Sequence, residues 1–204
     1  MAVTKTVDTN TIVKAVEIGL REFGENRVQE AKGKVAGLKS LAPDCRFVWH
    51  LVGHLQKNKA GAAVELFDLI HSVDSVELAR ELNEQAGKRD KIQRVLVQVK
   101  LSDEATKHGI SRDDLSGCLE RIAEMKNLKA EGLMTIPPFS DDPRTSRPYF
   151  RELRKIRDEA EKRGFMLKEL SMGMTNDFEV AIEEGATIVR IGTAIFGERK
   201  KEAR

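Results

Sequence analysis

The chain has 204 residues, of which 40% are hydrophobic and 33% charged, so its composition excludes a disordered chain and indicates one globular domain over residues 1–204. Its 35 Lys and Arg residues are interspersed with 33 Asp and Glu residues, which excludes the concentrated basic stripe of a nucleic-acid-binding protein. No apolar run approaches the ~18 residues of a membrane span and no signal-peptide pattern is visible, so with only two cysteines we expect a cytoplasmic protein with reduced thiols.

Short β-branched or apolar runs alternate with polar breaks and amphipathic stretches along the chain. Eight of these runs are candidate strands: Ala2–Val7, Arg21–Gly24, Phe47–Gly53, Leu66–Val73, Arg94–Val99, Lys129–Ile136, Leu167–Gly173 and Thr187–Gly192. Several are nearly continuous in Val, Ile and Leu, as is typical of parallel strands buried on both faces. The alternation predicts an α/β fold, a compact single-domain (β/α)8 TIM barrel, with a doubly wound open sheet as the alternative.

The stretches between the candidate strands carry helix signals. Two have the spacing of a capping box, Asp74 with Glu77 and Ser111 with Asp114. A later helix has one apolar face, formed by Phe150, Leu153, Ile156 and Ala160. We expect Gly164 to end that helix, Thr175 to cap the next and Gly185 to close it.

Polar and glycine residues are predicted at the carboxyl ends of the strands, where ligands bind in either fold. Lys5 lies near the end of the first candidate strand, and Asn26 follows the second. The seventh and eighth strands end in a larger set: Ser171, Met172, Gly173, Met174, Arg190, Gly192 and Thr193. Loops after strands seven and eight commonly bind phosphate in barrels, and glycines let the backbone approach a ligand closely. The alternative is that these glycines simply end the strands.

Lys5 is the candidate reactive group. A lysine that points into a barrel mouth is desolvated, and desolvation lowers the pKa of an amine. The neutral amine can then attack an aldehyde and form a Schiff base. The alternative is a surface lysine, or one paired with a carboxylate such as Glu25.

Taken together, these residues resemble those of the pyridoxal phosphate homeostasis protein family, whose members are small barrels similar to the N-terminal domain of alanine racemase. The resemblance is carried by AVTKT, FGENRVQE, WHLVGHLQKNK, HSVDS, GLMTIPP and LSMGMTNDFEVAIEEGATIVRIGTAIFG, which reach from residue 2 to Gly197. It implies that the cofactor is pyridoxal 5′-phosphate (PLP) and that Lys5 is its Schiff-base lysine.

The same resemblance implies the remaining contacts to PLP. Asn26 would lie beside the cofactor, and Arg190 would face the pyridine nitrogen. The phosphate would be held by Ser171, Gly192 and Thr193, with Met172 and Met174 lining the pocket and Gly173 beside them. The chain departs from the family pattern in three ways: Thr4 stands where serine is usual, His54 stands where proline is common, and the chain begins almost at the lysine strand.

The residue types favour a carrier over an enzyme. A guanidinium is a donor only and stays charged, so Arg190 would leave the pyridine nitrogen unprotonated and the ring a weaker electron sink. Racemisation also needs an acid or base on each face of the substrate carbon, and the second one in racemase-like enzymes is a tyrosine from a separate domain. This chain has one tyrosine, Tyr149, near the start of a predicted helix.

We therefore predict a PLP-binding protein of vitamin B6 homeostasis that holds PLP as a Schiff base without efficient catalysis. We expect a monomer whose partners are PLP and PLP-dependent apoenzymes, and no membrane or nucleic acid. The alternatives are a PLP-dependent amino-acid racemase, a Schiff-base lyase or aldolase, and a protein-interaction scaffold.

The histidines carry no predicted metal site. His50 and His54 are four residues apart, but they straddle a strand end and should not share a face. We expect His71 and His108 to be satisfied polar residues. The loop Ser140–Arg147 is a candidate flap over the site, with an ordinary exposed loop as the alternative.

Overall fold

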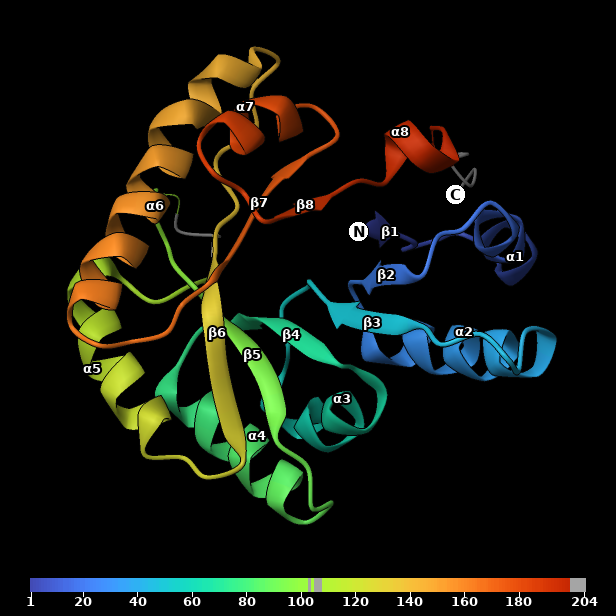
Figure 1. Cartoon of the computed structure of the whole chain (residues 1–204), viewed down its shortest axis with the longest axis horizontal. Helices are drawn as coiled ribbons and strands as arrows, with labels where there is room; N and C mark the ends of the chain where they lie inside the picture. The colour runs from blue at the N-terminus through green and yellow to red at the C-terminus, as the bar shows by residue number, and fades with distance from the viewer. Residues whose placement is uncertain (103, 105–107, 199–204) are drawn as a thin grey trace.

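The structure is a computed structural model and describes residues 1–102, 104 and 108–198 (Figure 1). Its strands are β1 (Ala2–Val3), β2 (Glu22–Glu25), β3 (Val48–Leu51), β4 (Leu69–Val73), β5 (Gln93–Gln98), β6 (Leu128–Met134), β7 (Glu169–Met174) and β8 (Ile188–Arg190). They form one sheet in sequence order, and every neighbouring pair is parallel.

The sheet closes on itself where its two ends meet. The Val3 N–H donates to the Ile191 carbonyl at 2.7 Å, and the Ile191 N–H donates to the Met1 carbonyl at 3.1 Å. A parallel bridge joins Ala2 to Ile191 in the same place. The predicted (β/α)8 barrel is therefore confirmed, and the open-sheet alternative is wrong because β1 is hydrogen-bonded to Ile191, the residue that follows β8.

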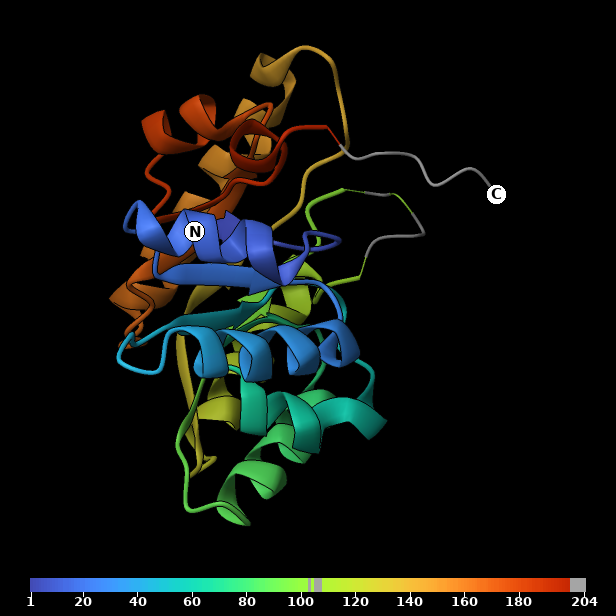
Figure 2. The same ribbon diagram turned by 90° about the vertical axis from the view of Figure 1, so that its right-hand side faces the viewer.

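Helices surround the strands on the outside (Figure 1). They are α1 (Thr9–Glu17), α2 (Val28–Leu41), α3 (Ala60–Leu66), α4 (Val76–Gly87), α5 (Arg112–Ala123), α6 (Arg147–Lys162), α7 (Phe178–Glu183) and α8 (Thr193–Phe196), with short 3-10 helices at Lys57–Lys59 and Pro143–Ser146. Successive helices from α1 to α4 contact one another, and Figure 2 shows them side by side on the outer surface. Within the part of the chain that the structure describes, none of the helices is long and apolar enough to cross a membrane.

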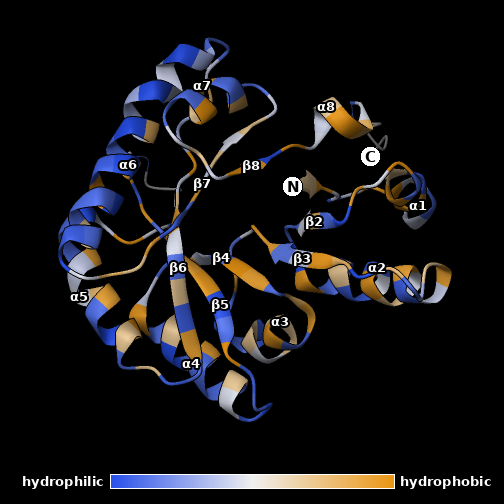
Figure 3. Cartoon of the chain, viewed as in Figure 1, coloured by the Kyte–Doolittle hydropathy of each residue, from blue (hydrophilic) through white to orange (hydrophobic). Residues whose placement is uncertain are grey.

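Apolar side chains fill two separate cores. The larger core lies between the sheet and the helices, and the predicted apolar face of α6 is buried in it, while the rest of α6 is hydrophilic (Figure 3). The smaller core contains Leu69, Leu96 and Met134, with Ile136 and Ile188 packed against it. Since residues alternate between the two faces of a strand, this second set lies inside the barrel.

The first strand is shorter than predicted. It ends at Val3, and the chain then turns, with the Val7 N–H donating to the Thr4 carbonyl at 2.9 Å. Thr6 has a φ of 64°, which a β-branched residue rarely adopts. Lys5 therefore lies in a turn beyond the strand, at the carboxyl end of the barrel.

Two predicted helix caps are also wrong. Ser75 caps α4, because its side chain accepts from the Leu78 N–H, and Asp74 lies outside the helix. Asp177 rather than Thr175 precedes α7, and its carboxylate accepts from the Met174 N–H at 2.7 Å. The predicted cap by Ser111 is confirmed, as are the helix ends at Gly164 and Gly185, which have φ values of 96° and 94°.

Candidate cofactor-binding site

A cavity of about 610 Å³ opens at the carboxyl ends of the strands. Six of the predicted cofactor residues line it: Lys5, Asn26, Met174, Arg190, Gly192 and Thr193. The rest of the wall comprises Val3, Val52, Ile136, Pro137, Pro138, Phe139, Ser140, Thr175, Asn176, Asp177 and Glu198. Of the candidate flap Ser140–Arg147, only Ser140 is among the described residues that line the cavity, and motion of this loop stays a prediction. The barrel thus brings together residues from both ends of the chain, in a space of the usual size for a cofactor site.

Three predicted residues, Ser171, Met172 and Gly173, are not among the cavity-lining residues that the structure describes. Ser171 is fully buried next to Arg190, and Met172 is fully buried in the core between sheet and helices. Gly173 has a φ of 89°, and a Cβ there would lie 2.5 Å from the Cβ of Ala181, so a glycine is needed for α7 to pack. The cofactor roles of these three residues stay predictions.

Side chains of α2 hold the backbone on both sides of Lys5. Lys34 is only 7% exposed, and its ammonium group donates to the Thr4 carbonyl at 2.6 Å. The Thr6 N–H donates to the carboxylate of Glu30, which also accepts from Lys34. Lys5 itself is half-buried in this turn. The backbone on either side of Lys5 is therefore held by side chains of α2.

A buried carboxylate completes this network. Glu25, at the end of β2, is fully buried and accepts from Lys34 at 2.8 Å and from the Thr4 hydroxyl at 2.6 Å. Burial raises the pKa of Glu25, while the hydrogen bonds from Lys34 and Thr4 act to lower it. Glu25 thus has Lys34 as its cationic partner. From the sequence alone, Lys5 is a candidate for this partner, as the alternative to a Schiff-base lysine.

Arg190 reaches the cavity from inside the barrel and has neutral partners. It is 4% exposed and donates to the Ser171 hydroxyl at 2.8 Å and to the Thr135 carbonyl at 2.9 Å. Burial lowers the pKa of Arg190 to about 10, so the guanidinium is still charged at neutral pH. Neither hydrogen-bond partner carries a negative charge, and the anionic group that acts on Arg190 is Asp177, which lines the same cavity and acts to raise the pKa of Arg190.

The polar contacts continue below Arg190 as a chain of two histidines. The Ser171 hydroxyl lies 2.8 Å from His71 Nδ1, and His71 Nε2 lies 2.9 Å from His50 Nδ1. Burial lowers the pKa of His50 to about 4 and that of His71 well below its ordinary value, so both are neutral at neutral pH.

Arg190 sets only the first contact of this chain. A guanidinium can only donate, so Ser171 accepts from Arg190, and its hydroxyl keeps one proton to donate and one further lone pair to accept with. His50 Nε2, at the far end of the chain, is buried and has no hydrogen-bond partner among the described residues. The contacts thus connect the charged group at the cavity to two neutral histidines in the barrel interior.

Gly53 allows Asn26 to reach the cavity wall. A Cβ on Gly53 would lie 2.2 Å from the Asn26 carbonyl oxygen, closer than any side chain permits. No local pattern in the sequence indicates this contact, because Asn26 follows β2 and Gly53 follows β3.

The donor set indicates the kind of ligand that the cavity can hold. An amine (Lys5), a buried guanidinium (Arg190), an amide (Asn26) and a hydroxyl (Thr193) surround one space. This combination fits a small anionic molecule that carries an electrophilic carbonyl group, because the cations attract the anion and the amine can attack the carbonyl carbon.

Comparisons with known proteins agree with this geometry. The family model described as "Alanine racemase, N-terminal domain" matches residues 1–200. The chain is 46% identical over 201 residues to a pyridoxal phosphate homeostasis protein of Aquifex aeolicus strain VF5, which covers 98% of this chain and 86% of the relative.

Among solved structures, PipY of Synechococcus elongatus PCC7942 with PLP bound has a TM-score of 0.89 and 40% identity, over 97% of this chain and 91% of that chain. PipY without PLP has a TM-score of 0.91 at the same identity, over 96% and 91%. An alanine racemase of Clostridium difficile 630 has a TM-score of 0.73 at 15% identity, over 98% of this chain and 52% of that chain, and shares the fold. The chain therefore belongs to the alanine racemase N-terminal domain family and, within it, to the pyridoxal phosphate homeostasis proteins.

Proposed function

We propose that this protein binds pyridoxal 5′-phosphate covalently through Lys5 and serves in PLP homeostasis without efficient catalysis. The observation that carries the proposal is the single cavity shared by Lys5 and Arg190. The name of the Aquifex relative and the PLP-bound structure of PipY support it.

Each lining residue has a role in this proposal. PLP supplies an aldehyde carbon, an aromatic ring and a phosphate. Lys5 provides the attacking amine, and Lys34 and Glu30 hydrogen-bond the backbone on either side of it. Gly192 and Thr193 follow β8, where barrels commonly bind phosphate, and are the proposed phosphate contacts. A phosphate contact from Ser171, whose hydroxyl bonds Arg190 and His71, remains a prediction.

Two features support a carrier over an enzyme. Arg190 would face the pyridine nitrogen with a donor-only group, which does not protonate the ring and leaves it a weak electron sink. Tyr149 lies in α6 and is not among the described residues that line the cavity, so it is not placed to act as the second base. The proposal also includes a monomeric, cytoplasmic protein that delivers PLP to apoenzymes.

Reduction with borohydride followed by peptide mass spectrometry tests the covalent step. We expect one added PLP group on the peptide that contains Lys5, and its loss in Lys5→Ala. Lys57→Ala is the control, because Lys57 is exposed in the 3-10 helix after β3 and should leave the modification unchanged. Modification at other lysines, or equal modification in Lys5→Ala, contradicts the assignment.

Turnover separates the carrier from the enzyme alternative. With PLP bound, we expect a panel of amino acids to keep its chirality and composition over many hours, and bound PLP to pass to an added apoenzyme. Steady racemisation or carbon–carbon cleavage that disappears in Lys5→Ala would instead establish a racemase or a lyase.

A further inference from the structure

Three side chains that bind metals elsewhere meet on the rim of the barrel, apart from the cofactor cavity. His54 follows β3, Asp74 follows β4 directly, and His108 lies in the segment after β5. One ligand atom from each lies within 4.8 Å of the other two. Among the described residues, this is the one group of three or more His, Cys, Asp or Glu side chains that could hold a metal ion. Because β3, β4 and β5 are consecutive parallel strands, their carboxyl ends deliver these residues to one place (Figure 1).

Asp74 is the centre of the group. Its Oδ2 lies 3.0 Å from His54 Nδ1 and 3.9 Å from His108 Nδ1, and its side chain is only 12% exposed. Asp74 does not cap α4, since Ser75 does so. The carboxylate is thus not needed by the helix, and both imidazoles approach the same oxygen.

The backbone holds His108 in position. The Gln98 amide donates to the His108 carbonyl at 2.9 Å. Next to it, the Ile110 N–H donates to the Gln98 carbonyl at 2.8 Å, and Ile110 forms a parallel bridge with Val99. On the other side, His54 lies between buried Val52 and Leu55, so both histidines are attached to ordered parts of the barrel.

We propose that His54, Asp74 and His108 form a binding site for one Zn²⁺ ion at the rim of the barrel. Two imidazoles and one carboxylate are a common donor set for transition metals. Zinc bonds of ~2.0–2.1 Å in a tetrahedral site place the ligand atoms roughly 3.3 Å apart, and the distances of 3.0 and 3.9 Å lie on either side of that value.

Binding requires one change in side-chain geometry. The two imidazole rings are stacked, with centroids 3.7 Å apart and an angle of 12° between planes, so their lone pairs lie in nearly parallel planes. Both side chains are exposed, and the rings must rotate for both lone pairs to point at one ion. Three protein ligands leave the fourth position open to water or to a small anion.

The site is adjacent to the wall of the cofactor cavity. His54 and Asn26 both line a second cavity of about 280 Å³, and Asn26 also lines the larger cavity next to Lys5. The three side chains of the site are not among the described residues that line the larger cavity.

Calorimetric titration of the whole chain with Zn²⁺, after chelator treatment and without PLP, tests the proposal. We expect one ion per chain, with affinity reduced roughly tenfold or more in His54→Ala and in His108→Ala. Glu77→Gln is the control, because Glu77 is a nearby exposed acid in the first turn of α4 and is not part of the group. Mg²⁺, which prefers oxygen ligands, should not compete.

Folding defects are separated from ligand loss by the two histidine variants. Both side chains are exposed, so the thermal midpoints without metal should match that of the unmodified chain, and only the increase caused by Zn²⁺ should be lost. The absence of Zn²⁺ binding by the unmodified chain, or an affinity for Zn²⁺ in the two histidine variants equal to that of the unmodified chain, would overturn the proposal.

Discussion

Lys5 depends on residues that do not touch the cavity. The ammonium group of Lys34 joins the Thr4 carbonyl, Glu25 and Glu30, so one side chain neutralises a buried carboxylate and holds the turn that carries Lys5. We expect Lys34→Met to lower the free energy of unfolding by about 3–5 kcal/mol, because it leaves the Glu25 charge buried without a partner. Urea unfolding and PLP affinity, measured together, should both decrease.

The double variant Lys34→Met with Glu25→Gln is the control for this prediction. Removing both charges should recover part of the stability, since the uncompensated charge is gone. PLP binding should stay weak, because the Thr4 carbonyl has still lost its donor. A single variant as stable as the unmodified chain would show that the network does not hold the turn.

Gly53 offers a second test at the scale of one residue. Gly53→Ala would place a Cβ 2.2 Å from the Asn26 carbonyl, so we expect a loss of about 1–3 kcal/mol and weaker PLP binding. Gly33→Ala is the control, because Gly33 is an exposed residue inside α2 with no atom within 4 Å of the added Cβ. That substitution should stabilise the protein by about 0.5–1 kcal/mol. Similar melting curves for the two variants would contradict the close contact.

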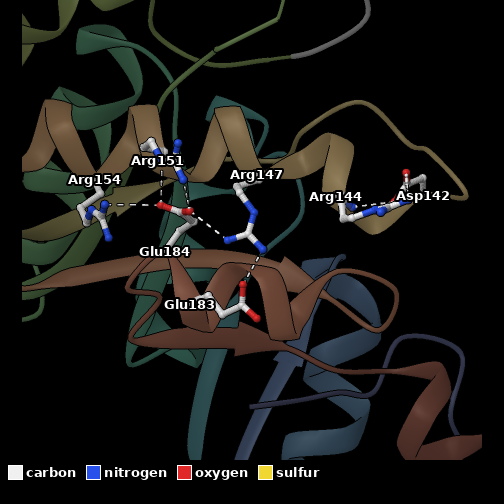
Figure 4. Close-up of polar contacts among 7 residues, drawn as sticks. All are labelled: Asp142, Arg144, Arg147, Arg151, Arg154, Glu183 and Glu184. Carbon is white, nitrogen blue, oxygen red and sulfur yellow. Dashed lines mark hydrogen bonds and ion pairs between the residues drawn. The ribbon is translucent and has the colours of Figure 1, made fainter.

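Among the helices, α6 and α7 are joined by an ion cluster (Figure 4). Glu184, at the end of α7, is 3% exposed and accepts hydrogen bonds from Arg147 at 3.1 Å and Arg151 at 2.8 Å, with Arg154 at 3.4 Å. The hydrogen bond from Arg151 lowers the pKa of Glu184. Since the loop before α7 lines the cavity, the cluster fixes one wall of the site against the outer helix.

We expect Glu184→Gln to lower the thermal midpoint by roughly 3–5 °C. The reason is that the three guanidinium groups of Arg147, Arg151 and Arg154 lose the buried carboxylate that they have in common. Glu183→Gln is the matched control: Glu183 is 59% exposed and bonds only Arg147 within this cluster, so its loss should change the midpoint little. Equal midpoints for the two variants in a calorimetric scan would show that the cluster does not stabilise the helix pair.

Elements with a strong local signal could be predicted from the sequence. The strand β5 contains the buried apolar run Val95, Leu96 and Val97, and the apolar face of α6 has clean helical spacing, so both elements were predicted correctly. The end of β1 was wrong because Thr4 to Thr6 favour a strand, while side chains of α2 bind their backbone and impose a turn.

The site could be predicted only in part, for the same physical reason. Lys5 and Arg190 were found because parallel strands end at one edge. The contacts of Ser171 with His71, 100 residues away, and of His71 with His50 depend on the registers of three strands in a closed barrel. No local pattern carries those registers.

At the scale of the whole molecule, the barrel encloses groups that must stay neutral for the fold to form. His50 and His71 are buried with pKa values far below the ~6.5 of an unfolded chain. Below pH ~6.5 the unfolded chain therefore binds protons that the folded chain does not. The free energy of unfolding consequently decreases as the pH decreases. This stability is fully present above pH ~6.5 and is lost as the pH falls towards the pKa of His50, about 4.

By pH 5, His50 alone is expected to cost about 2 kcal/mol of stability, measured as the urea midpoint at pH 7, 6 and 5 with a chelator present. His50→Gln should weaken this dependence, because an amide can hydrogen-bond His71 and does not titrate, while buried His71 keeps its own contribution. His54→Ala should keep it, since His54 is exposed. The carboxyl group of Glu25, whose pKa is raised by burial, acts in the opposite direction but is common to all three proteins. Two outcomes would contradict the prediction: a urea midpoint independent of pH in the unmodified chain, or the same pH dependence in His50→Gln as in the unmodified chain. Either would mean that protonation of His50 does not determine how stability changes with pH.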